Sequence, residues 1–282
     1  MNKMVNKVFF IVCIITSITV NSYADIKCKA TYGNSGKVYK LATGSPGELG
    51  LLKVIAEHFN NKNNTTMCWI KAGSGKSLSL LKNKQVDLIM VHAPANEKKA
   101  IKEGWAIKRT LIGSNEFYIV GPKDDPAGIN KAKTVAEAYK KIAITKSNFL
   151  SRGDNSGTNK KELAIWKKAH IKPNGDWYMI TKAFMMATLK QANEVQGYFM
   201  TDSSTWVAGR KNMNNLKVLF KGDPMLVNHY HALSQPKGVT NSSDIASKFI
   251  DFLASKEGQN LIASYGVDKY DKPMYNDAKH SK

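Results

Sequence analysis

The chain has 282 residues, of which 43% are hydrophobic, 9% aromatic and 23% charged. This composition is typical of globular proteins and excludes a collagen-like or wholly disordered chain. The 42 Lys and Arg residues exceed the 22 Asp and Glu residues and give a formal net charge of +20, so the surface attracts anions. The length predicts about two domains, each large enough to bury a core.

Residues 1–24 have the features of a secretory signal peptide. Lys3 and Lys7 supply positive charge, residues 8–20 form a short apolar run, and Ser22-Tyr23-Ala24 places small residues where a signal peptidase cleaves. The apolar run is too short to span a membrane. We therefore expect cleavage after Ala24 and a secreted protein.

Two cysteines, Cys28 and Cys68, follow the predicted cleavage site. In an oxidising compartment two thiols can pair, and the alternative is two separate buried thiols. A disulfide would close a loop of about 40 residues, which the chain-entropy model values at roughly 4 kcal/mol.

Strand-like and helix-like segments alternate along the chain. We expect strands at residues 38–43, 67–71, 86–91, 117–120, 142–145, 197–200, 218–220 and 229–233. We expect helices at residues 49–60, 77–81, 96–103, 134–140, 160–170, 183–194, 243–254 and 257–264. Residues 86–91 form a nearly continuous apolar run, which is typical of a strand buried on both faces. The alternation predicts an α/β fold with mainly parallel sheets.

Three polar, glycine-containing turns follow predicted strands, at residues 42–48, 72–77 and 151–158. In an open parallel sheet such turns lie at the carboxyl edge, where ligands bind. Helix N-termini offer unpaired N–H groups there, and Arg152 can make a charge-assisted bidentate contact. Together these groups suit a tetrahedral anion, whereas each turn alone could be an ordinary helix cap.

Other patterns in the sequence do not indicate a nucleotide site, a metal site or a catalytic site. Gly75-Lys76-Ser77 resembles the end of a phosphate-binding loop, but Ile70 stands where the first glycine belongs. His229 and His231 share one strand face without a nearby carboxylate or cysteine, so we expect a structural or site-lining role and no metal site. No catalytic triad can be assembled, and the scattered lysines lack a nucleic-acid motif. We expect neither an enzyme nor a biological nucleic-acid partner.

Several stretches resemble the tungstate-binding proteins of ABC-type importers. They are VDLIMVHAP at residues 86–94, NEFYIVGPKDDPAGI at 115–129 and SRGDNSGTNKKE at 151–162. The resemblance implies a type II periplasmic binding protein, with two α/β lobes, each a mainly parallel sheet flanked by helices, that close on an anion. The crossover strands would be residues 115–121 and 228–234.

The implied first lobe is discontinuous and comprises residues 25–116 and 229–282, whereas residues 117–228 form the second lobe. The anion contacts of that family map onto five residues of this chain. They are Thr43, Ser45, Ser74, Gly75 and Arg152. We add Ser156 as the N-cap of the helix that follows Arg152.

The chain departs from the family in two places. The Thr-Thr-Thr-Ser run of the family's first turn is Ala-Thr-Gly-Ser at residues 42–45 here, and its Gly-Gln-Gly-Met-Gly stretch is replaced by residues 182–186, Lys-Ala-Phe-Met-Met. Lys76 or Lys182 would be candidates to supply charge in place of the missing hydroxyls.

The resemblance implies a monomeric periplasmic receptor that captures tungstate or molybdate and passes it to an ABC permease in the inner membrane. No cofactor is expected, and tungsten or molybdenum would enter only as the bound oxyanion. Two alternatives stay open. One is the same fold with another small anion, such as phosphate, sulfate or a carboxylate, and the other is a surface antigen or adhesin with a degenerate cleft.

Overall fold

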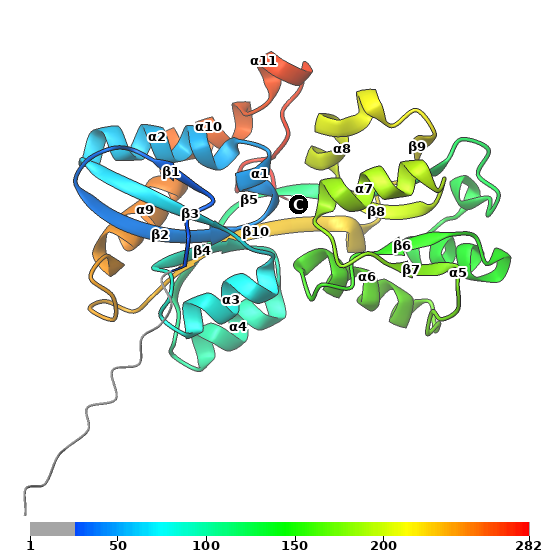
Figure 1. Ribbon diagram of the computed structural model, residues 1–282, viewed down its shortest axis with the longest axis horizontal. Coiled ribbons are helices and arrows are strands. Elements are labelled where there is room, and N and C mark those ends of the chain that lie inside the picture. The colour runs from blue at the N-terminus through cyan, green and yellow to red at the C-terminus, as the bar shows by residue number, and fades with distance from the viewer. Residues whose placement is uncertain (1–25, 282) are drawn as a thin grey trace, which may run out of the picture.

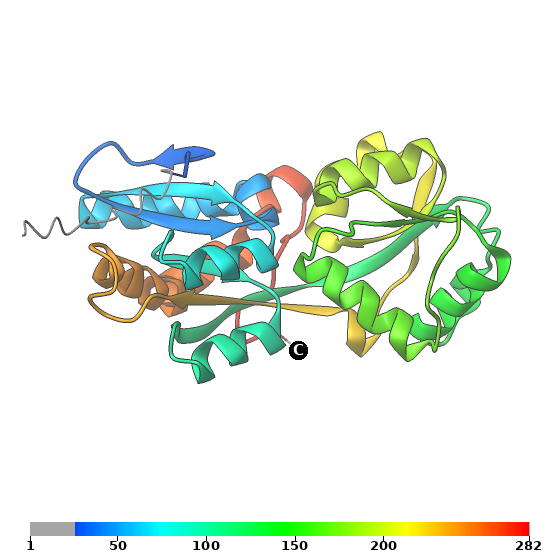
Figure 2. The ribbon, with the colours of Figure 1, turned by 60° about the horizontal axis from the view of Figure 1, so that its bottom comes forward.

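The computed structural model describes residues 26–281. The predicted signal peptide and its cleavage site lie outside the described residues. Figures 1 and 2 show two lobes side by side, joined by strands that pass from one to the other. Among residues 26–281, no helix is long and apolar enough to cross a membrane.

Lobe 1 is built on the parallel strands β3-β2-β4, with β1 antiparallel to β3 at the outer edge. Its strands are β1 (Ala30–Tyr32), β2 (Lys37–Thr43), β3 (Thr65–Lys71) and β4 (Leu88–Val91). Its helices are α1 (Ser45–Glu48), α2 (Leu51–Asn63), α3 (Ser74–Lys82), α4 (Pro94–Lys102), α9 (Ser243–Ala254), α10 (Lys256–Ser264) and α11 (Val267–Tyr270).

Lobe 2 is built on the parallel strands β8-β6-β7. Its strands are β6 (Phe149–Ser151), β7 (Tyr178–Ile180), β8 (Tyr198–Asp202) and β9 (Leu216–Phe220). Its helices are α5 (Val135–Thr145), α6 (Gly157–Lys168), α7 (Met185–Glu194) and α8 (Ser203–Gly209), with short 3-10 turns at Ile129–Lys131, Arg210–Asn212 and Pro224–Leu226.

Two long strands connect the lobes. Strand β5 (Ile107–Pro122) and strand β10 (Val227–Ser234) pair antiparallel, from Glu116 opposite Val227 to Ile107 opposite Ser234. Strand β10 also pairs with β4 in lobe 1, and β5 pairs with β8 and β9 in lobe 2. The two-lobe α/β fold with crossover strands is therefore confirmed, although antiparallel strands make the sheets mixed.

Each lobe has its own aromatic core. In lobe 2, Trp166 lies 4.4 Å from the ring of Tyr139 and 5.1 Å from that of Phe149, centroid to centroid. In lobe 1, Phe59 and Phe249 pack edge to face at 5.1 Å. Separate cores allow each lobe to move as a unit about the strands between them.

The predicted strand at residues 142–145 is wrong, because these residues continue helix α5. Thr134 caps the helix by accepting a hydrogen bond from the Glu137 amide. Val135, Ala138 and Ile142 then fall on one buried face at helical spacing. The strand lies later, at β6, and its end positions the third polar turn. Elements β1, β7, α1, α8 and α11 were not predicted.

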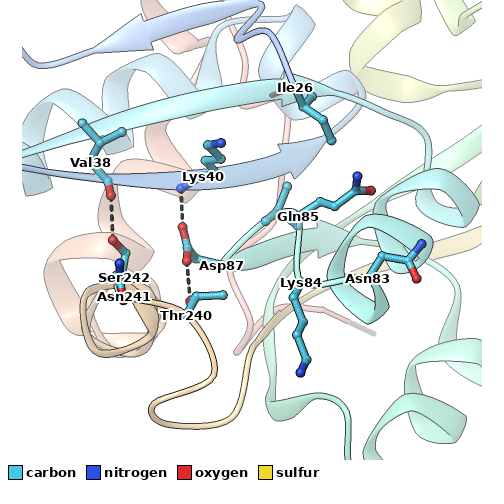
Figure 3. A pocket seen from close by; sticks show the side chains of 11 residues that line it. Ile26, Val38, Lys40, Asn83, Lys84, Gln85, Asp87, Thr240, Asn241 and Ser242 are labelled. Carbon is cyan, nitrogen blue, oxygen red and sulfur yellow. Dashed lines mark hydrogen bonds between the residues drawn. The ribbon is translucent and has the colours of Figure 1, made fainter. Parts of the chain in front are cut away.

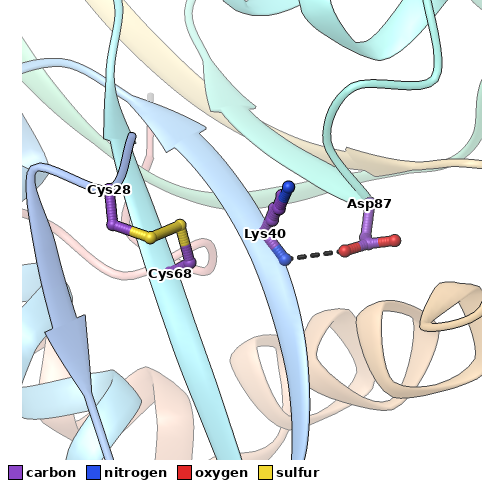
Figure 4. The surroundings of a disulfide bond; sticks show 4 residues. All are labelled: Cys28, Lys40, Cys68 and Asp87. Atoms are coloured by element: carbon purple, nitrogen blue, oxygen red, sulfur yellow. Dashed lines mark hydrogen bonds between the residues drawn. A yellow bond between two sulfur atoms is a disulfide. The ribbon is translucent and has the colours of Figure 1, made fainter. Parts of the chain in front are cut away.

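The predicted disulfide is present. Cys28 and Cys68 are bonded, with their Cα atoms 5.3 Å apart (Figure 4). Cys68 lies on the buried strand β3, so the bond fixes the segment before β1 to the middle of β3, the strand beside the sheet edge.

Candidate functional site

A small cavity lies at the seam between the lobes, where the three polar turns meet. The cavity is small and suits a guest of a few heavy atoms. It is lined by Thr43, Gly44, Ser45, Pro46, Gly73, Ser74, Met90, His92, Arg152, Ser156, Phe184 and Tyr230. Five of the six predicted site residues are thus brought together, and Gly75 is the exception.

Arg152 enters the cavity from the end of β6 and is only 4% exposed. Its Nε donates to the carbonyl oxygen of Ala183 at 3.1 Å, and one terminal nitrogen pairs with Asp154 at 2.6 Å. The ring of Phe184 lies beside the guanidinium, 5.4 Å from its carbon. These contacts fix the orientation of Arg152 before any guest binds.

Two helices direct their N-termini at the cavity from opposite lobes. Gly73 and Ser74 begin α3 of lobe 1, and Ser156 is the N-cap of α6 of lobe 2. The first N–H groups of a helix have no intrahelical acceptor, and they carry the positive end of the helix dipole. The cavity therefore favours negative charge.

The hydroxyl groups around the cavity differ in what they can offer. Thr43 Oγ1 donates its proton to the carbonyl oxygen of Met90 at 2.8 Å. Ser74 Oγ instead accepts from the His92 amide, and Ser156 Oγ accepts from the Asn159 amide, each at 3.2 Å. Because accepting leaves the hydroxyl proton free, Ser74 and Ser156 remain able to donate to a guest.

This difference gives a prediction for hydroxyl removal. Ser74→Ala and Ser156→Ala should each weaken anion binding by about 1 kcal/mol, roughly fivefold, the loss of one neutral hydrogen bond. Thr43→Val should change the affinity less than twofold, since that hydroxyl already donates within the protein. Isothermal titration calorimetry measures all three, and a larger loss for Thr43→Val than for the serine variants would contradict the assignment.

Glycines allow the two lobes to approach closely at the seam. A Cβ on Gly75 would lie 2.4 Å from the carbonyl oxygen of Asn155, and one on Gly157 would lie 2.5 Å from the His92 ring. Each contact joins one lobe to the other. Gly75 therefore lies against the opposite lobe beside the cavity, instead of lining it.

Gly157→Ala should act as a wedge between the lobes. The added methyl group collides with His92, whose ring is packed against Tyr230 at 5.1 Å and Phe117 at 6.1 Å, so closure becomes less favourable. We expect anion affinity about tenfold lower, because only the closed fraction binds tightly. Small-angle X-ray scattering should show a larger radius of gyration, which Gly157→Ala combined with His92→Ala should reverse. Wild-type dimensions in the single variant would refute the wedge.

Four lining residues lie outside the three predicted turns, and Met90, on β4, is one of them. His92 ends β4, Tyr230 comes from β10, and Phe184 precedes α7. Only His92 carried a sequence signal, since it directly follows the buried apolar run. Lys76 and Lys182 are exposed and do not line the cavity, whereas Lys71 lies 4.2 Å from the Phe184 ring centroid and pairs with Glu48.

His231, for which the sequence indicated no nearby carboxylate, has one in the structure. His231 Nδ1 lies 3.0 Å from Glu97 Oε2, which also pairs with Arg109. No cluster of three or more His, Cys, Asp or Glu side chains that could hold a metal ion occurs within residues 26–281.

A wider hollow lies at the amino ends of β2 and β4 (Figure 3). The Asp87 carboxylate at its floor accepts from the Lys40 amide at 2.6 Å and from Thr240 Oγ1 at 2.5 Å. Ser242 Oγ donates to the carbonyl oxygen of Val38 at 2.6 Å. These bonds join α9 and its loop to the sheet, so the polar groups of this hollow serve the fold.

Comparison with known proteins shows the family to which the chain belongs. A family model described as a PBP superfamily domain matches residues 30–257. The tungstate-binding protein TupA of Peptoclostridium acidaminophilum is 30% identical over 275 residues, covering 93% of this chain and 96% of that protein. The tungstate-binding protein TupA of Campylobacter jejuni is 32% identical over 237 residues, covering 82% and 87%.

A solved structure agrees with these sequence comparisons. The tungstate ABC transporter structure from Geobacter sulfurreducens is 38% identical and superposes with a TM-score of 0.74, covering 82% of this chain and all of that one. The likeness spans both lobes and the seam between them.

Proposed function

The chain belongs to the PBP superfamily, and on this premise we propose that it captures a small tetrahedral oxyanion, with tungstate or molybdate favoured, between its two lobes. The names of its relatives support this ligand class. One observation carries the proposal. A buried, pre-oriented arginine and the N-termini of two helices from opposite lobes surround a single small cavity.

The size and chemistry of the cavity favour this class of guest. A sugar or a peptide needs a far larger volume, whereas a tetrahedral anion has few atoms and accepts many hydrogen bonds. We assign direct contacts to Ser74, Arg152 and Ser156, with the first amide groups of α3 and α6. Ser45 is a further contact, since its hydroxyl donates to Asp202 only at 3.5 Å and can turn to a guest.

The cellular role follows from the same class of protein. We propose that the protein works in the periplasm after cleavage behind Ala24, as a monomer that delivers its anion to an ABC permease in the inner membrane. Lobe 1 comprises residues 25–116 and 229–282, and lobe 2 comprises residues 117–228. No chemical step is involved, because affinity comes from fixed donors that lobe closure shields from water.

Calorimetry with tungstate, molybdate, sulfate and phosphate tests the proposal directly. The protein should first be unfolded and refolded to strip any guest that it carries. We expect the tightest binding from tungstate or molybdate. Elemental analysis of unstripped protein should find tungsten or molybdenum near one atom per chain. Tighter binding of phosphate or sulfate would identify that anion as the ligand and keep the proposed class of tetrahedral oxyanions. No binding of any of the four would refute the proposal.

A further inference from the structure

His92 lies between the cavity and a second groove on its outer side. Its half-buried ring lines both the cavity and an outer groove between α4 and α6. The ring lies on Tyr230 on one side, and Gly157 of the opposite lobe approaches it. Any anion in the cavity is therefore a neighbour of this imidazole.

A directed chain of hydrogen bonds fixes the proton on the His92 ring. The chain starts at Asp202, a carboxylate that can only accept. Asn115 donates its amide group toward Asp202 and Ser204, at 3.4 and 3.1 Å, so its oxygen is left to accept from Asn228 at 2.8 Å. The oxygen of Asn228 must then accept from His92 Nδ1, also at 2.8 Å.

The neutral ring consequently carries its proton on Nδ1. Nε2, on the other side of the ring, holds a lone pair and has no hydrogen-bond partner among residues 26–281. A lone pair repels the oxygen of a fully deprotonated anion. It becomes a donor only when the imidazole gains a second proton.

The charges around the cavity leave an anion incompletely neutralised. Arg152 is already paired with Asp154, and Lys71 with Glu48. Asp202 adds a buried negative charge close to the seam. His92 is the remaining side chain of the cavity wall able to become a cation, since Tyr230 can only lose a proton.

The charged groups that face His92 act in opposite directions. Burial lowers the pKa of His92 to about 4, Asp202 and Glu97 oppose this effect, and Arg152 adds to it. The imidazole is therefore neutral near pH 7. A dianion placed against it would favour the charged form strongly, as an opposite charge within about 4–6 Å does.

We propose that His92 takes up a proton from solvent at Nε2 when a fully deprotonated oxyanion binds, so that the captured anion gains a second cationic donor beside Arg152. The inference rests on the proposed function and deepens it. An oxyanion that carries its own proton, such as hydrogen phosphate, could donate to the Nε2 lone pair and would need no uptake. His92 thereby distinguishes the two classes of tetrahedral anion.

Calorimetry with sodium molybdate at pH 6.0, in buffers of different ionisation enthalpy, measures this proton directly. The wild-type protein should take up roughly half to one proton per molybdate, and its affinity should weaken by up to about tenfold per pH unit as the pH rises. His92→Gln should bind with no uptake and with an affinity that changes little with pH. His92→Asn serves if the first variant does not fold.

A matched control is His58→Gln, which makes the same chemical change at a partly exposed histidine of α2 that pairs with Glu257. It should retain the wild-type uptake. Molybdate binding with less than about 0.2 proton taken up, or equal uptake in His92→Gln, would overturn the inference and leave the proposed function standing. Failure of the wild-type protein to bind any oxyanion would overturn both.

Discussion

Arg152→Ala should weaken oxyanion binding roughly 30- to 4,000-fold, which corresponds to about 2–5 kcal/mol for the removal of one partner from a buried charged contact. The guanidinium is the one permanent cation that lines the cavity, and it is held in place by Ala183 and Asp154. Its removal deletes the contact and also leaves the carboxylate of Asp154 without its cation near the anion. Calorimetry with molybdate or tungstate measures the change.

Three further variants separate the causes of that loss. Arg152→Ala combined with Asp154→Ala removes the uncompensated carboxylate, so any recovered affinity reports repulsion. Arg152→Lys keeps the charge but loses the planar fork and should remain well below the wild-type affinity. Lys76→Ala removes an exposed cation from the first turn of α3 and should change the affinity less than twofold. Equal losses for Arg152→Ala and Lys76→Ala would show that only the general field of the protein matters.

Sequence periodicity predicted a helix or strand well where the spacing of its own apolar residues matched the face that it buries. Helix α9 has the predicted bounds, Ser243–Ala254, because its apolar residues recur at helical spacing. The prediction failed at residues 142–145, where Ile142 and Ile144 look like a strand in isolation. Only the capped helix that begins at Val135 explains why Ile142 is buried and Ile144 is exposed.

The candidate site was predictable in part for a different reason. Residues beside a strand end, such as Ser74 and Arg152, are located by local turn chemistry. Tyr230 and Phe184 reach the cavity from other elements, and nothing in their own neighbourhoods marks them. The same holds for the chain from Asp202 to His92, whose members are far apart in the sequence and meet only where the crossover strands join the lobes.

A buried acid, Glu162, holds the polar turn that carries Arg152. Glu162 of α6 is 2% exposed and lies under the end of β6. Its carboxyl group accepts from Tyr178 Oη at 2.6 Å, from Ser151 Oγ at 2.8 Å and from Trp166 Nε1 at 3.2 Å. Burial outweighs these bonds and raises the pKa of Glu162 to about 7.

Glu162 and His92 give opposite contributions to stability as the pH changes. The pKa of Glu162 is higher in the folded chain than in the unfolded chain, so its contribution is full below pH 4.5 and is lost as the pH rises through 7. The pKa of His92 is lower in the folded chain, so its contribution is full above pH 6.5 and is lost as the pH falls toward 4. The two effects offset one another in the wild-type protein.

Glu162→Gln should therefore make the free energy of unfolding fall more steeply as the pH decreases. Between pH 7.5 and pH 5.0, the free energy of unfolding of the variant should fall by about 2 kcal/mol relative to the wild type, because only the carboxyl group gains stability from protonation. Urea unfolding at the two pH values measures the difference, in which His92 and all other shared groups cancel. Adding His92→Gln should flatten the remaining slope. If the free energy of unfolding of the variant changes with pH as that of the wild type does, Glu162 is ionised in the folded chain. Its three hydrogen-bond donors would then stabilise the charge despite its burial.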